Sequence, residues 1–140
     1  PRSILALTFT NKAADEMKTR VAALANDEPV WISTFHRFCA RMLRRYANLV
    51  GLEPGYSIYD TGDSKQTLKR AIADSKIELA HITPERVTSE ISWAKNNLIP
   101  PDKYQPRRGS EVGEVVARAY PAYQQALRRA NAVDFDDLLL

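Results

Sequence analysis

An apolar strand that runs into a helix through a polar turn is the feature that most constrains how this chain can fold. Residues 4–7 (Ile-Leu-Ala-Leu) form a short apolar run, which predicts a strand buried on both faces. Apolar residues then recur at helical spacing from 13 to 24, which predicts a helix capped by Thr10 or Asn11. Unpaired backbone N–H groups at the start of such a helix, together with the Lys12 cation, suit a phosphate. An ordinary capped strand–helix turn shows the same pattern, so this segment alone leaves both interpretations open.

The chain repeats this design once. Residues 30–33 (Val-Trp-Ile-Ser) form a second, largely apolar run, and Thr34-Phe35-His36 forms the turn. A strongly amphipathic helix is predicted from there to about residue 50. Gly51 follows as its expected C′ residue. The polar face of this helix carries four arginines and no acid: Arg37, Arg41, Arg44 and Arg45. Arginine-rich faces are usually only solvated, but a face this one-sided also favours phosphate contacts.

Composition predicts a folded globular chain. The chain has 140 residues, of which 44% are hydrophobic and 26% charged, enough for one domain or for one domain and part of another. The net charge of +3 is too small to indicate a nucleic-acid partner by itself.

Cys39 is the only cysteine, which excludes a disulfide framework, and it is expected to be a small core residue. No apolar run reaches the length of a membrane span. The start has neither an initiator methionine nor a signal-peptide pattern, so we expect it to be cut from a longer chain.

The centre of the chain is predicted to be helical. The expected bounds of three further helices are about 60–79, 83–97 and 112–131. Asp60 or Thr61 can cap the first of them, and Thr83 the second. Pro121 lies inside the third and is expected to kink it or split it in two. A short extended piece is predicted at 56–59, before the first of these helices.

Three short motifs resemble those of one enzyme family. T-F-T-N-K-A-A at 8–14 resembles motif Ia of the UvrD/Rep/PcrA helicases of superfamily 1. T-F-H at 34–36 resembles motif Ib, and D-F-D-D-L-L at 134–139 resembles a further segment of the same family. The motifs occur in the family's order, and the resemblance covers essentially the whole chain.

The resemblance implies a mainly α fold, in which a helical insert is flanked by strand–helix pieces of a RecA-like P-loop α/β domain. Residues 1–34 would belong to the RecA-like subdomain 1A and carry motifs Ia and Ib. Residues 35–131 would form the helical insert, subdomain 1B, and residues 132–140 would return into subdomain 1A. The chain would then be a fragment that covers subdomain 1B and flanking parts of subdomain 1A.

The resemblance also implies a parent enzyme, a cytoplasmic ATP-dependent 3′-to-5′ DNA helicase or translocase of DNA repair or replication. ATP and Mg²⁺ would be bound by that parent and not by this chain. The sequence contains no G-x-x-x-x-G-K-[ST] loop and no apolar strand that ends in two acids. We therefore expect no catalytic, cofactor-binding or metal-binding residue here, and no ATPase activity. Asp134, Asp136 and Asp137 are better explained by helix capping and dipole neutralisation.

Single-stranded DNA and a DNA duplex junction are the partners that the resemblance implies, with no membrane partner. In the family, motifs Ia and Ib line the path of the single strand. Phe9 would contact a base or sugar, and His36 would stack on or hydrogen-bond a base. Thr10, Asn11 and Thr34 would hold the DNA backbone. The full set of expected nucleic-acid-binding residues is Phe9, Thr10, Asn11, Lys12, Thr34, His36, Arg37 and Arg41.

Other residues have expected roles outside this single-strand interface, and two alternative functions stay open. Phe35 is expected to pack in the core, and His81 to have no specific role. The candidates for contact with the duplex are Lys95, Lys103, Arg107 and Arg108. Two other classes of protein stay open: a helicase–nuclease of the AddA/RecB type, and a non-enzymatic helical interaction module in which the motifs are only structural.

Overall fold

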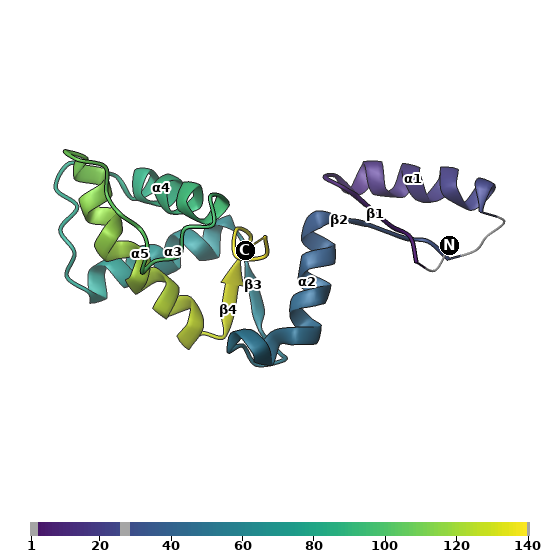
Figure 1. Cartoon of the computed structure of the whole chain (residues 1–140). Helices are drawn as coiled ribbons and strands as arrows, with labels where there is room; N and C mark the ends of the chain where they lie inside the picture. The colour runs from purple at the N-terminus through teal and green to yellow at the C-terminus, as the bar shows by residue number, and fades with distance from the viewer. Residues whose placement is uncertain (1–2, 26–28, 140) are drawn as a thin grey trace. The chain divides into compact units, whose positions relative to one another are not determined.

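The computed structural model of the chain describes residues 3–25 and 29–139, and the chain divides into two compact units. We call Pro1–Tyr46 the N-terminal unit and Ala47–Leu140 the C-terminal unit. Most residues of each unit lie in helices, and each unit contains one two-stranded parallel sheet (Figure 1). The expectation of a mainly helical chain with strand–helix pieces is confirmed at this level. The assignment of residues 35–131 to subdomain 1B stays a prediction.

In the N-terminal unit, two parallel strands are each followed by a helix. Strand β1 (Leu5–Thr8) pairs with β2 (Trp31–Thr34) in the register Leu5↔Trp31 to Thr8↔Thr34. Helix α1 (Asn11–Leu24) follows β1 and packs against both strands, and α2 (Phe35–Tyr46) follows β2 directly. Because the strands are parallel, both end on the same side, and both helices begin there (Figure 1).

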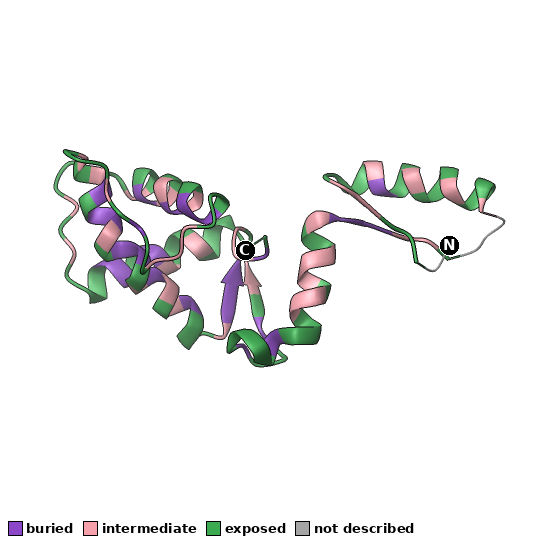
Figure 2. Ribbon diagram, in the orientation of Figure 1, coloured by how far each residue is buried: buried purple, intermediate pink, exposed green. Residues whose placement is uncertain are grey.

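Strand β1 is less buried than its apolar sequence predicts. Its residues are half-buried or exposed, with Leu5 42% exposed, and Ile4 just before it is 55% exposed (Figure 2). The prediction of a strand buried on both faces is therefore wrong. Within the described residues β2 is its single strand neighbour, and a sheet of two strands leaves much of its surface uncovered. On the helices, Leu24 at the end of α1 is exposed, Ala14 is buried, and Cys39 is half-buried.

The C-terminal unit packs three helices around one hydrophobic core. Its elements are the 3₁₀ helix η1 (Ala47–Val50), β3 (Ser57–Tyr59), α3 (Thr61–Asp74), α4 (Pro84–Asn96), α5 (Glu111–Arg129) and β4 (Ala132–Asp134). Helix α5 packs against both α3 and α4 (Figure 1). The largest fully buried apolar side chains of this core are Leu68, Val87, Val116, Tyr120 and Leu127. Among the described residues, no helix has the length and apolar character that crossing a membrane requires.

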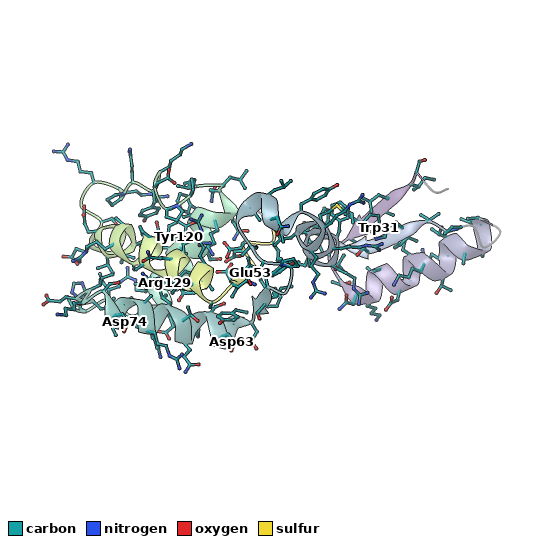
Figure 3. All side chains as sticks on the ribbon, turned by 90° about the horizontal axis from the view of Figure 1, so that it is seen from below. Trp31, Glu53, Asp63, Asp74, Tyr120 and Arg129 are labelled. Atoms are coloured by element: carbon teal, nitrogen blue, oxygen red, sulfur yellow. The ribbon has the colours of Figure 1, made fainter. Side chains whose placement is uncertain are left out.

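Strands β3 and β4 pair in parallel, although all three long helices of the unit lie between them in the sequence. Their register runs from Ser57↔Ala132 to Tyr59↔Asp134. Asn131 strengthens this end of the sheet, since its side-chain oxygen accepts from the Glu53 N–H at 2.9 Å (Glu53 is labelled in Figure 3). The extended piece predicted at 56–59 is therefore a strand, and its pairing holds the two ends of the helical core together.

Local capping signals place the helix starts correctly. Asp60 caps α3 and Thr83 caps α4, each through a side-chain oxygen that accepts from backbone N–H in the first turn. Gly51 adopts the predicted left-handed conformation, with φ at +74°. Helix α3 ends at Asp74, earlier than predicted, and α5 continues through Pro121 without splitting. Pro121 is exposed, so water can satisfy the carbonyl that its missing N–H leaves unpaired.

Three tyrosines make the C-terminal unit sensitive to alkali. Burial, followed by a hydrogen bond to Glu90, raises the pKa of Tyr104 to about 12. Burial also raises the pKa of Tyr123 and of Tyr120, which lies among the helices of this unit (Figure 3). The folded state disfavours the phenolate, so the stability that these groups contribute is complete below the ordinary pKa of 10.0. It is lost as the pH rises from there toward about 12.

We expect the urea midpoint of the C-terminal unit, followed by circular dichroism, to fall steadily above about pH 10. Tyr104→Phe should flatten this decline, because it removes one group that ionises more easily in the unfolded chain. Tyr46→Phe is the control, since Tyr46 is exposed and belongs to the N-terminal unit. A midpoint that stayed level up to the raised pKa of Tyr104 would contradict the burial of these hydroxyls.

Candidate nucleic-acid interface

The two parallel strands of the N-terminal unit bring two polar turns side by side. We call the surface formed by residues 8–12 and 34–37 the carboxyl edge. Thr8 and Thr34 are partners in the β1–β2 register, so the turns that follow them are neighbours. Helices α1 and α2 begin at these turns (Figure 1), and their first backbone N–H groups give the edge a partial positive charge. Such an edge suits an anion.

Two threonine hydroxyls cap these helices. Thr10 Oγ1 accepts from the Ala13 N–H at 3.1 Å, and Thr34 Oγ1 accepts from the Arg37 N–H at 3.3 Å. Thr10 or Asn11 was predicted to cap α1, and the first contact shows that Thr10 is the N-cap. A hydroxyl that accepts in a cap still has its proton to donate, so both can also bind a phosphate oxygen. Thr10 is exposed, whereas Thr34 is only 8% exposed and leaves little surface for a ligand.

An aromatic ring is the most exposed part of the carboxyl edge. Phe9 is 83% exposed, and its ring centroid lies 5.0 Å from that of Phe35, with the ring planes tilted by 41°. Phe35 is half-buried, so its predicted packing in the core holds for only part of the side chain. His36, the next residue of α2, is exposed. A nucleobase stacked on Phe9 would cover apolar surface that the N-terminal unit leaves in water.

Cations surround the carboxyl edge. Lys12 in the first turn of α1, and Arg37 and Arg41 on α2, are exposed. Within residues 3–25 and 29–139, none of these three is in a salt bridge with a carboxylate. The pKa of Asp15 is lowered by its hydrogen bond to Lys18, by the Lys18 charge and, to a smaller extent, by the Arg37 charge. Arg37 on α2 therefore lies close enough to α1 for its charge to act on Asp15.

Seven of the eight predicted nucleic-acid-binding residues, Asn11 included, belong to the carboxyl edge, and Arg41 lies one turn further along α2. Sequence reasoning did not identify Trp31 as part of this region. The guanidinium carbon of Arg41 lies 4.7 Å from the Trp31 ring centroid, and the Phe38 ring lies 5.2 Å from that of Trp31. This contact joins a strand to a helix, so no helical or strand spacing signals it. Nucleic-acid binding by these residues stays a prediction.

The acidic segment of the C-terminal unit builds a buried ionic cluster. Lys95, predicted as a duplex contact, is 1% exposed, so that prediction is wrong. Its Nζ lies 2.7 Å from Asp134 Oδ2 and 2.7 Å from Asp137 Oδ1, because two buried carboxylates require a nearby cation. Lys95 shares the face of α4 that carries Val87 and Ile91 into the core. Their i, i+4, i+8 spacing is the sequence signal that could have identified it.

Asp134 and Asp137 also cap each other. The Asp137 N–H donates to Asp134 Oδ1 at 2.9 Å, and the Asp134 N–H donates to Asp137 Oδ2 at 3.1 Å, the reciprocal pattern of a capping box. The predicted helix is absent, because the described chain beyond β4 forms turns, so helix capping and dipole neutralisation do not explain these acids. Asp134 and Asp137 cap backbone N–H groups of a turn instead. Asp136 instead accepts from Asn96 Nδ2 at 3.1 Å.

The two carboxyl groups of this cluster differ in acidity. Burial raises the pKa of Asp134, but the Lys95 charge and the hydrogen bonds outweigh burial, and the net pKa lies below its ordinary value. At Asp137 burial and the Asp134 charge together outweigh Lys95, and the pKa lies above its ordinary value. Asp137 is therefore the carboxylate that takes up a proton more readily.

Comparison with known proteins assigns the family. The sequence profile of the family described as UvrD/REP helicase N-terminal domain matches residues 1–140. The chain belongs to this family. It is 41% identical over 143 residues to an ATP-dependent DNA helicase PcrA from Leuconostoc citreum, a match that covers 100% of this chain and 19% of the relative. Proteins of the same name from Staphylococcus epidermidis and Staphylococcus aureus are also 41% identical, over 142 residues, covering 100% of this chain and 20% of each relative. The resemblance seen in the motifs is confirmed, and the chain spans about a fifth of the length of these relatives.

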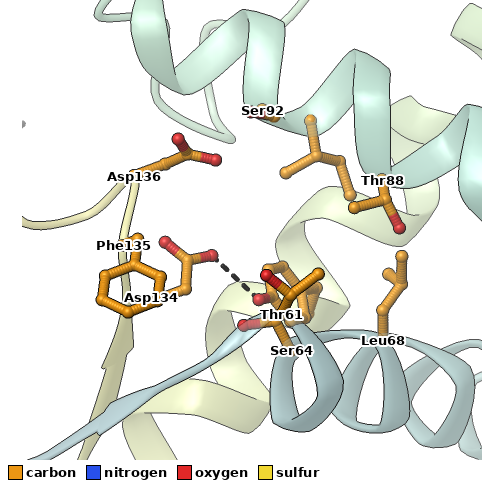
Figure 4. A pocket seen from close by; sticks show the side chains of 10 residues that line it. Thr61, Ser64, Leu68, Thr88, Ser92, Asp134, Phe135 and Asp136 are labelled. Carbon is orange, nitrogen blue, oxygen red and sulfur yellow. Dashed lines mark hydrogen bonds between the residues drawn. The ribbon is translucent and has the colours of Figure 1, made fainter.

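In this UvrD/REP helicase domain, a cavity of about 240 Å³ lies beside the acidic cluster. Hydroxyl groups from α3, α4 and α5 line much of it: Thr61, Ser64, Thr88, Ser92 and Tyr123. Tyr123 donates its hydroxyl proton to Asp134 at 2.8 Å, the contact drawn as a dashed line in Figure 4. Asp134 also accepts from Lys95 and from the Asp137 N–H. Its charge is therefore already compensated where the carboxylate meets the cavity.

The remaining candidates for duplex contact are exposed in this helicase domain. Lys103 and Arg108 lie on the surface of the C-terminal unit. Arg107, also exposed, places its guanidinium carbon 5.3 Å from the Trp93 ring centroid. His81, expected to have no specific role, pairs with an exposed glutamate of α5 at 2.8 Å. Contact of Lys103, Arg107 and Arg108 with a duplex stays a prediction.

Proposed function

We propose that the N-terminal unit binds single-stranded DNA at the carboxyl edge, as part of an ATP-dependent 3′-to-5′ DNA helicase or translocase. The observation that carries this proposal is an exposed aromatic ring, Phe9, set beside two helix N-termini and cations without carboxylate partners in the described residues. A DNA strand presents both bases and phosphates, and the edge has a ring for the first and donors for the second. The relatives named as ATP-dependent DNA helicases support the same class of substrate.

Stacking and backbone contacts have separate roles in this proposal. Phe9 and His36 contact bases and sugars, where stacking is worth about 1–3 kcal/mol per base. Thr10, Asn11 and Thr34 hold the backbone through hydroxyl, amide and N–H groups, and the cations of the edge neutralise phosphates. Every base has a π-face, so stacking accepts any sequence. A motor that passes over arbitrary sequence requires that tolerance.

ATP and Mg²⁺ belong to the proposed activity of the whole helicase, and the residues of this chain do not fit them. The sequence has no G-x-x-x-x-G-K-[ST] loop to hold a triphosphate. Asp134 and Asp137 are paired with Lys95 and are not placed to hold Mg²⁺. In the part of the chain that the structure describes, no group of three or more His, Cys, Asp or Glu side chains is arranged for a metal ion. We therefore assign no catalytic step to this chain.

The 140-residue chain by itself is expected to hydrolyse no ATP, with or without single-stranded DNA. The reason is that the sequence has no loop to hold the triphosphate, and none of the residues in 3–25 and 29–139 is arranged to position the attacking water. In a continuous assay of phosphate release, the rate should stay at the buffer level as the protein concentration rises. A DNA-stimulated rate that grew in proportion to the purified chain would contradict this expectation.

Titration of labelled oligonucleotides, read by fluorescence anisotropy, tests the proposed interface. We expect mixed-sequence and homopolymeric single strands to bind the 140-residue chain with similar affinity. Blunt duplex should bind more weakly, because its bases are not available for stacking on Phe9. Affinity should fall with rising salt, because each phosphate contact releases counterions. A strong preference for one base sequence, or duplex binding as tight as single-strand binding, would contradict the proposal.

The same titration separates one of the two alternative functions from the proposal and leaves the other unchanged. A helicase–nuclease of the AddA/RecB type would carry the same carboxyl edge and bind single strands in the same way. A non-enzymatic interaction module would bind no DNA, and its partner would be another protein. The 41% identity to proteins named as helicases favours the helicase over both alternatives.

A further inference from the structure

We propose that the bound strand continues from the carboxyl edge along α2, where Arg37, Arg41 and Arg45 bind successive phosphates and Trp31 holds Arg41 in place. This inference rests on the proposed function. It adds the path that the DNA strand takes across the N-terminal unit, and it assigns Trp31 as a positioning residue. Its starting point is a row of arginines, of which Arg41 and Arg45 contact aromatic rings of the N-terminal unit. Among the described residues, none of the row forms a salt bridge with a carboxylate. Both Trp31 and the arginines lie within that unit.

The three arginines form one stripe on α2. They are spaced i, i+4 and i+8, so each is about 6 Å further along the helix axis than the one before it, at 1.5 Å per residue. Each step also turns by only about 40°, because four residues slightly exceed one helical turn. All three side chains are exposed. The stripe starts at Arg37, on the carboxyl edge, and leads away from it.

These arginines differ from the cations of α1 in their partners. On α1, Lys18 pairs with Asp15 and Arg20 pairs with Glu16. Across residues 3–25 and 29–139, no salt bridge joins a carboxylate to the arginines of the stripe. The sequence has no acid between residues 29 and 52. An external polyanion is the partner that such a stripe fits.

Trp31 fixes the position of the central arginine. The Arg41 guanidinium carbon lies 4.7 Å from the Trp31 ring centroid, and Phe38 packs against the same indole at 5.2 Å with a tilt of 55°. Stacking uses the flat face of a guanidinium, while its five N–H donors point outward in the plane. The Trp31 ring therefore contacts the face of the Arg41 guanidinium, and the N–H donors at its edges remain available to a phosphate. A lysine ammonium has no such face and would not be held in the same way.

Salt-dependent binding of oligonucleotides to the 140-residue chain tests this inference. Two single strands are compared, one of about four nucleotides and one of about twelve, within the range of known site sizes. For the longer strand, Arg41→Ala and Arg45→Ala should each reduce the slope of log K against log salt by about 0.7, the value for one phosphate contact of a single strand. For the shorter strand, which the carboxyl edge alone can hold, Arg45→Ala should change nothing. Arg129→Ala, at an exposed arginine of the C-terminal unit, is the control and should change neither slope.

A double-mutant cycle tests the role of Trp31. Trp31→Leu should weaken binding of the longer strand by about two- to fivefold, the range for an exposed cation–π contact. The same change should have no further effect in an Arg41→Ala background, whereas general damage to the fold would weaken both. Arg41→Lys should behave like Trp31→Leu in its affinity while keeping the salt slope.

The outcomes separate this inference from the proposed function. If Phe9→Ala loses affinity while Arg41→Ala and Arg45→Ala match the unmodified chain on both strands, the stripe is not part of the path and this inference is wrong. If Phe9→Ala binds both strands normally, the carboxyl edge itself is not the interface. If Trp31→Leu weakens binding equally with and without Arg41, Trp31 acts on the fold and is not a positioning residue.

Discussion

Replacing Lys95 with methionine is expected to lower the free energy of unfolding by about 3–5 kcal/mol, the usual cost of removing one partner from a buried ion pair. The Lys95 side chain is 0% exposed and forms ion pairs with both Asp134 and Asp137, each at 2.7 Å. Methionine fills a similar volume, so the change removes the charge and leaves the packing of α4 nearly intact. The two carboxylates would then face each other in the core without a cation.

Urea unfolding of the 140-residue chain, followed by circular dichroism, measures this effect. Lys103→Met is the matched control, because Lys103 is exposed on the same unit and should tolerate the change within about 0.5 kcal/mol. The deficit of Lys95→Met should shrink as the pH falls toward the ordinary carboxyl pKa of 3.8, because protonation removes the repulsion. Equal stability of the two variants at neutral pH would mean that the ionic cluster is not buried as described.

Phe9→Ala and His36→Ala are each expected to weaken single-strand binding by about 1–3 kcal/mol, the usual range for loss of one base-stacking side chain. Phe9 is 83% exposed, so its removal should cost the folded chain little stability. The loss should be similar for strands of different sequence, since the stacked base can be any base.

Anisotropy titrations at fixed salt measure both affinities. Leu49→Ala is the matched control for Phe9, because Leu49 is 81% exposed, is also apolar and lies in the C-terminal unit. Circular dichroism of each variant shows whether the fold is intact. Unchanged affinity in both Phe9→Ala and His36→Ala would return these side chains to a purely structural role at the strand–helix turns.

The parts of the fold that the sequence predicted correctly depend on short stretches of chain. Asp60, Thr83 and Gly51 act within a few residues of their own position, so residue type and spacing are sufficient to identify them. The pairing of β3 with β4 depends instead on how α3, α4 and α5 pack, and it has no local signal. The exposure of Leu5 likewise depends on how many strands flank β1, which its own sequence does not contain.

The residues of the candidate interface likewise fall into those that the sequence predicted and those that it could not predict. Motif spacing identified the carboxyl edge, because each strand–turn–helix is a continuous segment and parallel pairing brings the two turns together. The stacking of Arg41 on Trp31 could not be predicted, since it joins two elements through their tertiary arrangement. Lys95 was misplaced for a different reason. A charged residue on a helix is usually solvated, and its position on the apolar face becomes decisive only when Asp134 and Asp137 are known to be buried.

Mapping of amide chemical shifts on the 140-residue chain, titrated with an unlabelled single-stranded oligonucleotide, tests the central proposal most directly. We expect the largest shifts at residues 8–12 and 34–45, which are the carboxyl edge and the arginine stripe of α2. Buried amides of the C-terminal core, such as those of Val116 and Leu127, should not move. Shifts confined to the C-terminal unit, with Phe9 and His36 unchanged at saturating DNA, would contradict the proposed interface.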